Sequence, residues 1–404
     1  MKTQRLRWLG DPALVGSAFL LSFIGVAMIW SAGQLDVPSA VTEIWKRQAL
    51  WLAIAAVVFL VVSRVPLRWI EGGSSLVYVV SIALLVLVLM VGSGPGTNSW
   101  LRFGSYSLQP AEVAKLGTLL MLARVLSGRA DPEARLSRLW RPLLIAAVPF
   151  GLVLLQPDLG SAITFGVILV AALYWARVPL FTVFMLVSPG VSLLLGFSAT
   201  VWGVWFVIVV LLMYLRRPFL LEGIAVTLAN LAAGALATPL WAQLAPYQQN
   251  RLLVFLDPGR DPRGAGWHLI QSQVAIGSGG LLGQGFGNGP QKRLSFLPEQ
   301  HTDFIFSVVG EELGFFGVLV LLALYAWLLR RLLEAASRSP NEFGGIVVFC
   351  VFAVWFAHLL INVGMTVGLM PVTGLPLPFL SYGGSFLLMT FVGVGLAARV
   401  WSES

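Results

Sequence analysis

Two aspartate–proline pairs mark the stretch FLDPGRDPRGAGWHLIQSQ, residues 255–273. Asp257 and Asp261 each precede a proline, and cationic side chains surround them: Arg251, Arg260 and Arg263. Aspartate and proline are common turn formers, so either pair can be purely structural. An aspartate ringed by cations can also act as a general base, provided that it reaches the proton it removes. The pattern therefore indicates either a turn or a catalytic base.

A second polar segment, LPEQHTDFIFSVVGEELGFFG at 297–317, combines several carboxylates with an imidazole. Its candidate substrate-binding residues are Glu299, His301, Thr302 and Asp303. The pair His301 and Asp303 alone is only a weak indication of a metal site. Glu311 and Glu312 lie about two turns inside a predicted membrane helix, where ionisable groups are costly and are usually paired or functional.

The stretch GSGGLLGQGFGNG at 277–289 has seven glycines but matches no known nucleotide-binding pattern. It can be a flexible turn, or its amide groups can donate hydrogen bonds to a phosphate. Lys292 and Arg293 follow directly, and their charges suit an anionic headgroup.

Three further segments carry candidate residues. Glu112 and Lys115 are three residues apart on one predicted helix, so they can pair with each other or bind substrate. Asp158 follows a predicted span in LLQPDLGS, where it can cap the next helix. The segment PVTGLPLPFLSYGGS at 371–385, with Ser381 and Tyr382, predicts ordered non-helical chain, which membranes tolerate only inside protein or along a cavity.

The elements that must position these residues are membrane helices. The chain is 58% hydrophobic and 11% charged, with a mean hydropathy of +0.86. Repeated long apolar runs predict an all-α polytopic membrane protein with about 10–12 transmembrane helices. The single Cys350 excludes an intrachain disulfide and a zinc site made of several thiolates. Twelve candidate helices cover residues 11–32, 47–64, 74–92, 110–126, 141–156, 160–176, 180–197, 199–215, 220–242, 303–329, 343–366 and 379–398.

The positive charges predict the orientation. With the first helix entering from the cytoplasm, 17 of the 26 Lys and Arg residues lie in cytoplasmic segments. The net charge of +8 is therefore interpreted as a topology signal, and no nucleic-acid partner is expected. The N- and C-termini are predicted to be cytoplasmic. The long loop 243–302 is then extracytoplasmic, and Trp267, Ile270 and Val274 suggest a short amphipathic helix on the membrane surface.

Taken together, the motifs are more specific than any one of them. DPRGAGWHLIQSQVAIGSGGLLGQG, FLPEQHTDFIFSVVGEELGFFG, QPDLGS, QPAEVAK and PVTGLPLPFLSYGGS are all present. The chain resembles the shape, elongation, division and sporulation (SEDS) family of bacterial cell-wall polymerases over its whole length. PVTGLPLP resembles the elongation branch, RodA, more than the division branch, FtsW. The family commonly has an arginine where Ser99 stands and P-S-E where Pro110, Ala111 and Glu112 stand, so residues 99–112 depart from the family pattern.

The resemblance implies a single integral-membrane domain over 1–404, with 243–302 as its extracytoplasmic catalytic loop. It implies a peptidoglycan glycosyltransferase of the cytoplasmic membrane that polymerises lipid II during elongation, by inverting transfer. It places the family's essential aspartate at Asp261 and not at Asp257. A divalent cation (Mg or Mn) is the expected cofactor. The expected partners are a class B penicillin-binding protein, the undecaprenyl-linked substrate and other membrane proteins of the elongation complex.

Two alternatives remain open from the residues themselves. The chain can be a transporter that flips lipid II, or a scaffold for the wall-synthesis enzymes. A transporter is expected to carry charge along a midplane cavity, whereas the polar residues here are predicted to lie at the outer surface. The expected substrate-binding set is Glu112, Lys115, Asp158, Arg260, Arg263, Lys292, Arg293, Glu299, His301, Thr302, Asp303, Ser381 and Tyr382.

Overall fold

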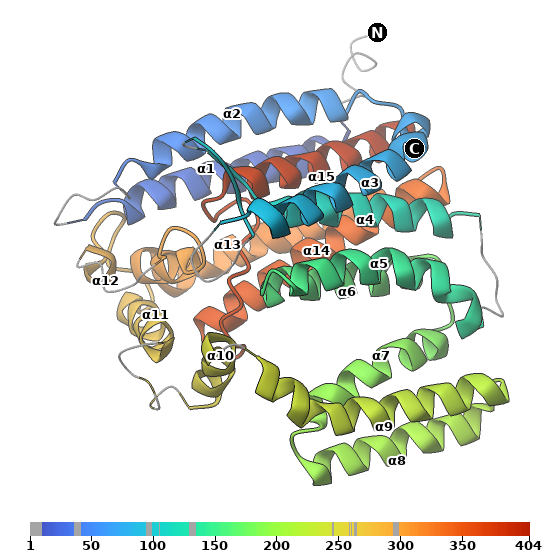
Figure 1. The fold of residues 1–404 in the computed structure, drawn as a ribbon. Helices are drawn as coiled ribbons and strands as arrows, with labels where there is room; N and C mark the ends of the chain where they lie inside the picture. Colours follow the sequence, from blue (N-terminus) through green and yellow to red (C-terminus); the bar gives the residue numbers. More distant parts are fainter. Residues whose placement is uncertain are drawn as a thin grey trace.

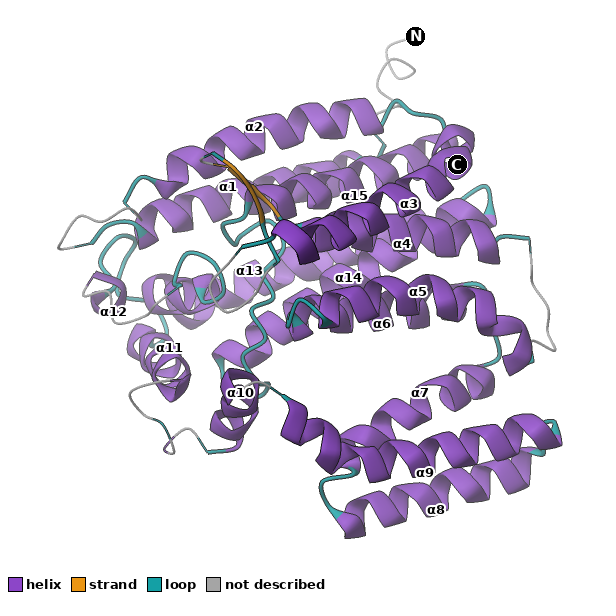
Figure 2. Cartoon of the chain, viewed as in Figure 1, coloured by secondary structure: helices purple, strands orange, loops and turns teal. Residues whose placement is uncertain are grey.

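The structure is a computed structural model that describes residues 10–35, 42–93, 99–104, 106–128, 135–244, 246–257, 259, 261, 265–293 and 299–404. These residues form a bundle of helices with one short β-hairpin (Figures 1 and 2). The long helices are α1 (Pro12–Ala32), α2 (Ile44–Val62), α3 (Leu67–Val91), α4 (Pro110–Leu126), α5 (Trp140–Leu154), α6 (Leu159–Trp175), α7 (Leu180–Leu195), α8 (Ala199–Arg216), α9 (Leu220–Gln243), α13 (Ile305–Ser337), α14 (Glu342–Thr366) and α15 (Gly384–Glu403).

All twelve helices predicted from the sequence are confirmed. The main differences are at the ends, because α3 begins at Leu67 rather than 74 and α13 continues to Ser337 rather than 329. Within the described residues, nine helices are long and apolar enough to cross a membrane, and α6 and α7 are shorter apolar helices. The protein is therefore a polytopic helical membrane protein, as predicted.

The β-hairpin was not predicted. Strand β1 (Leu101–Phe103) pairs antiparallel with β2 (Tyr106–Leu108), and Leu101 lies opposite Leu108. Strands of three residues carry too little alternation to be recognised in a sequence.

The largest hydrophobic core joins α1, α2, α4, α6, α13, α14 and α15. Helices α7, α8 and α9 form a separate group at the periphery of the bundle (Figure 1). Asn230 of α9 is buried in this group, where it donates to Ser188 Oγ at 2.9 Å and accepts from Ser192 Oγ at 2.6 Å. Polar side chains thus bond across helices in the hydrocarbon region, where no water is available to replace those partners.

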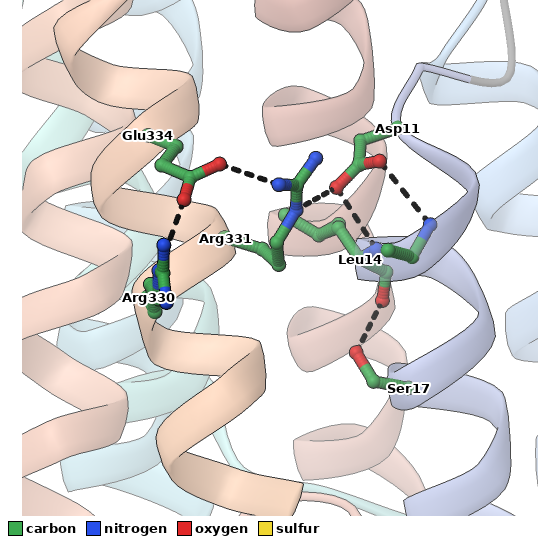
Figure 3. A network of polar contacts seen from close by, with 7 residues as sticks. Asp11, Leu14, Ser17, Arg330, Arg331 and Glu334 are labelled. Carbon is green, nitrogen blue, oxygen red and sulfur yellow. Dashed lines mark hydrogen bonds and ion pairs between the residues drawn. The ribbon is translucent and has the colours of Figure 1, made fainter.

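An ion-pair network links α1 and α13 at the end of the bundle where α15 also finishes (Figures 1 and 3). Asp11 caps α1 by accepting from the Leu14 amide at 3.1 Å, and Arg331 donates to the same carboxylate at 2.5 Å. Arg331 also pairs with Glu334. Burial alone would raise the pKa of Asp11, but the hydrogen bond from Arg331 and the helix amides outweigh it and lower that pKa.

The glycine-rich stretch docks against a break in α13. Gly314 has φ 64° and ψ −167°, which interrupts the helix. The amides of Gln284 and Gly285 donate to the carbonyls of Glu311 and Glu312 at 2.9 and 3.1 Å. These two amides therefore bind protein carbonyls, and the phosphate-cradle interpretation of this stretch does not hold for them. Their role is to fasten the stretch to α13.

Three shorter helices lie between α9 and α13: α10 (Pro246–Leu256), α11 (Ala265–Gly279) and α12 (Pro290–Arg293). Figure 1 shows them gathered at the end of the bundle opposite the C-terminus. Helix α11 forms as predicted, but it buries Leu269, Ser272 and Ala275 against α13 and α14. Val274, predicted to belong to the apolar face, is 44% exposed. Ser272 and Ala275 are small, so they allow α11 to approach the neighbouring helices closely.

Candidate functional site

A cavity of about 290 Å³ lies among α10, α11 and the start of α13. Its polar lining consists of Asn250, Arg251, Asp261, His268, Glu299 and Asp303. Its apolar lining includes Phe304, Met370 and Val372. The structure therefore brings the first aspartate stretch and the 297–317 segment together, as two sides of one cavity.

The two aspartates of the first stretch have different surroundings. Asp261 is half-buried and lines the cavity, and its carbonyl accepts from the Gly266 amide at 3.0 Å where α11 begins. Asp257 is exposed, and its Oδ1 accepts from the Gly259 amide at 3.1 Å. Asp257 thus makes a local turn, whereas Asp261 faces a space that a substrate can enter.

The segment 299–304 accepts hydrogen bonds from α14 and from the chain that precedes α15. Asn362 of α14 donates to the carbonyls of Asp303 and Leu375 at 2.9 and 2.8 Å. The Ser381 hydroxyl donates to the Thr302 carbonyl at 2.6 Å, and the Tyr382 amide donates to the His301 carbonyl at 2.8 Å. Ser381, Tyr382, His301 and Thr302 therefore shape the cavity wall without lining the cavity.

Burial controls the ionisation of the cavity side chains. Burial, together with the neighbouring Glu299 charge, raises the pKa of Asp303 to about 6. Burial lowers the pKa of His268, whose ring stacks on Phe304 at 5.9 Å between centroids. At neutral pH the His268 imidazole is accordingly neutral. Among the described lining residues, the side chains of Asp261, Glu299 and Asp303 outnumber the one arginine.

A second cavity of about 120 Å³ adjoins the first and shares Arg251 and Val372 with it. Asp158, Gln248 and Thr373 supply its other polar groups. Asp158 caps α6 by accepting from the Ser161 amide at 2.9 Å, and it accepts from Gln109 Nε2 at 3.0 Å. The helix-cap role expected for Asp158 is therefore present, and it coexists with a place at the edge of a cavity.

Several expected substrate ligands lie elsewhere. Glu112 and Lys115 form a buried ion pair of 2.6 Å beside a small cavity of about 40 Å³ between α4, α14 and α15. Lys292 is fully buried against Glu312 and Ser31, so it is not available to a substrate headgroup. Arg293 is exposed on α12 and lines neither the 290 Å³ nor the 120 Å³ cavity. Arg260 and Arg263 lie outside the described residues.

Two cavity residues, Arg251 and His268, were not in the expected substrate-binding set. Arg251 lies on α10 ten residues before Asp261, and His268 lies seven residues after it on α11. His268 sits inside the quoted aspartate motif, so its proximity to Asp261 was a usable signal. Arg251 was noted among the cations near the two aspartates, and the packing of α10 beside α11 is what brings it to the cavity.

A divalent cation in this cavity would need several ligand atoms that converge on one point. Asp261, Glu299 and Asp303 line one space, but among the described residues no three His, Cys, Asp or Glu side chains are grouped to hold one ion. The residues present do not fit a ready-made divalent-cation site.

Known proteins resemble the chain over almost its full length. The FtsW/RodA/SpoVE family model, described as "Cell cycle protein", matches residues 12–205 and 198–404. A protein named peptidoglycan glycosyltransferase MrdB from Escherichia coli is 36% identical over 392 residues, which cover 96% of this chain and 93% of that protein. Peptidoglycan glycosyltransferase RodA from Treponema pallidum is 32% identical, with 96% and 97% covered.

Solved structures share the fold. One, from work on the coordination of polymerization and crosslinking by a peptidoglycan synthase complex, has a TM-score of 0.70, 32% identity and 98% coverage of both chains. The crystal structure of the Rod shape determining protein RodA from Thermus thermophilus has a TM-score of 0.64 and 29% identity, with 98% of this chain and 97% of that chain covered.

Proposed function

Because the chain belongs to the FtsW/RodA/SpoVE family, we infer that it is a peptidoglycan glycosyltransferase of the bacterial inner membrane, and we propose that Asp261 is its general base. It polymerises lipid II during elongation. The observation that carries the proposal is the placement of Asp261 in a polar cavity, while Asp257 is exposed and engaged in a turn. The loop 243–302 contributes Arg251, Asp261 and His268 to this cavity and acts as the catalytic loop.

The reaction joins an acceptor sugar to a donor held through a pyrophosphate. The acceptor 4-hydroxyl oxygen attacks the anomeric carbon, and the bond from that carbon to the pyrophosphate oxygen breaks. The Asp261 carboxylate accepts the hydroxyl proton, and the bonding electrons leave with the pyrophosphate. An α-linked donor gives a β-linked product by this single displacement, so no covalent enzyme intermediate is needed.

Glu299, Asp303 and neutral His268 assist by binding sugar hydroxyl groups. Each presents hydrogen-bond acceptors to the same cavity as Asp261. The segment that holds Glu299 and Asp303 is anchored by Asn362 and Ser381, so the acceptor meets a wall of fixed shape. Such prior positioning reduces the entropy lost when the two sugars align.

A class B penicillin-binding protein is the proposed crosslinking partner. The similar chain from work on a peptidoglycan synthase complex supports this assignment, because its title couples polymerization to crosslinking. Other membrane proteins of the elongation complex complete the proposed set of partners. The expected Mg²⁺ or Mn²⁺ stays an expectation without assigned ligands.

Matched variants test the base directly. Purified protein would be supplied with lipid II, and glycan strands would be measured for wild type, Asp261→Asn and Asp257→Asn. We expect Asp261→Asn to slow polymerisation at least about 100-fold, with unchanged folding by size-exclusion chromatography. Asp257→Asn should stay close to wild type. Loss of activity in Asp257→Asn with an active Asp261→Asn would refute the assignment.

A further inference from the structure

The cavities of about 290 and 120 Å³ differ in the charge of their described lining residues. Among the residues that the structure describes, the larger cavity is lined by Asp261, Glu299 and Asp303 but by one arginine. With all three ionised, these described side chains leave two negative charges in excess, and protonation of Asp303 still leaves one. A pyrophosphate dianion placed there would be repelled at close range, since like charges in a partly buried site are weakly screened. A sugar, which has no charge at the reacting hydroxyl, is accommodated.

The charges of the described residues that line the smaller cavity cancel. This cavity contains the carboxylate of Asp158 and the guanidinium of Arg251. The Asp158 charge is spread over hydrogen bonds from Ser161 and Gln109. Arg251, in contrast, lines both cavities. An anion bound where the two cavities meet would therefore be attracted by Arg251 and would lie near Asp261. Arginine suits this role, because its planar donors match phosphate oxygens.

The smaller cavity also has features that fit the rest of a lipid-linked donor. The Thr373 hydroxyl oxygen is buried without a hydrogen-bond partner beside this cavity. A buried hydroxyl without a partner is uncommon, and a ligand oxygen would satisfy it. Leu159, Ile163 and Leu252 line the cavity, and Ile163 is 46% exposed on α6. An apolar chain can therefore leave the cavity along α6 toward the bilayer.

We propose that the smaller cavity is the subsite for the pyrophosphate and first prenyl units of the lipid-linked donor, with Arg251 as its anion ligand. The acceptor sugar occupies the larger, carboxylate-lined cavity. Arg251 thus places the scissile bond at the junction, next to Asp261. This inference rests on the proposed function and adds an assignment of its two substrates to two places.

Binding of undecaprenyl pyrophosphate, which carries no sugar, tests the subsite without requiring turnover. Affinity would be measured on the full-length protein in nanodiscs for wild type, Arg251→Gln, Glu299→Gln and Arg293→Gln. Loss of a charge-assisted hydrogen bond predicts weakening of about 10- to 100-fold for Arg251→Gln. Glu299→Gln, which alters only the larger cavity, should bind as tightly as wild type or tighter. Arg293→Gln, an exposed arginine outside both cavities, should be unchanged.

A second variant guards against misfolding. Ile163→Trp adds bulk at the exposed rim of the smaller cavity and should also weaken binding several-fold. Equal affinity in Arg251→Gln and wild type would overturn the inference, as would an equal loss in Arg293→Gln, which would indicate diffuse attraction. The proposed function fails separately, if Asp261→Asn polymerises normally while the binding pattern is as expected.

Discussion

Lys292 offers a sharp test, because its sequence context suggested substrate binding and the structure places it in the protein interior. The Lys292 ammonium donates to the Ser31 carbonyl at 2.9 Å and forms an ion pair with Glu312. The Ser31 hydroxyl donates to both Glu312 oxygens, at 2.6 and 2.7 Å. The side chains of Lys292 and Glu312 are both 0% exposed, so neither charge has water to replace its partner. Burial lowers the pKa of Lys292 despite the nearby carboxylate.

Replacing Lys292 with methionine leaves the Glu312 charge buried without its partner. Removal of one member of a buried pair costs about 3–5 kcal/mol, so the free energy of unfolding should fall by roughly that amount. The double variant Lys292→Met, Glu312→Leu removes both charges and should recover most of the loss. The neighbouring exposed Arg293→Met should change stability by less than about 0.5 kcal/mol.

The assay is denaturant unfolding in mixed micelles, followed by tryptophan fluorescence and evaluated as a double-mutant cycle. A coupling energy of about 3 kcal/mol between Lys292 and Glu312 would support a structural pair that fixes α12 to α13. The reasoning would be refuted by a Lys292→Met protein that keeps wild-type stability and loses affinity for lipid II. That result would make Lys292 a substrate ligand after all.

Three further predictions concern charge and polarity. Asp303→Asn should raise the free energy of unfolding at pH 7 by on the order of 2 kcal/mol. The folded pKa of Asp303, about 6, lies above the ordinary 3.8, so the wild type loses stability as the pH rises between these values. Unfolding of both proteins across that pH range checks the prediction. Asp11→Asn should lower the free energy of unfolding by about 1 kcal/mol at pH 7. Because the folded pKa of Asp11 is lowered, the wild type has this contribution above the pKa of Asp11 in the unfolded chain and loses it on acidification. The stabilities of variant and wild type should therefore converge at low pH. Asn230→Leu should lower the free energy of unfolding by about 1–2 kcal/mol, since Ser188 and Ser192 each lose one hydrogen bond and keep their bonds with Met185 and Trp205. Equal thermal stability of variant and wild type would contradict it.

Helices and the aspartate motif were accessible from the sequence because both are local signals. Each long helix is an apolar run, and such a run can be recognised in the sequence because it must be long enough to cross the membrane. Asp261 and Asp257 could be told apart only by resemblance, and the structure gives the difference a physical basis in cavity and turn.

The pairing of charges was not accessible, because it depends on contacts far apart in the chain. Lys292 donates a hydrogen bond to Ser31, which is 261 positions away in the chain. No local spacing pattern predicts a contact over that separation. The glycines of 277–289 suggested a phosphate cradle, but whether an amide faces a ligand or a carbonyl of α13 depends on tertiary packing. Arg251 enters the site for the same reason, through the approach of α10 to α11.

The most direct test of the central claim is polymerisation of purified lipid II by the purified protein, wild type beside Asp261→Ala. A class B penicillin-binding protein lacking its crosslinking serine would be present, so that only glycan strands form. We predict strands of many disaccharides from wild type and none from Asp261→Ala, with equal amounts of folded protein. Equal strand formation by both proteins would contradict the assignment of Asp261, and no strands from either would contradict the assignment of the polymerase itself.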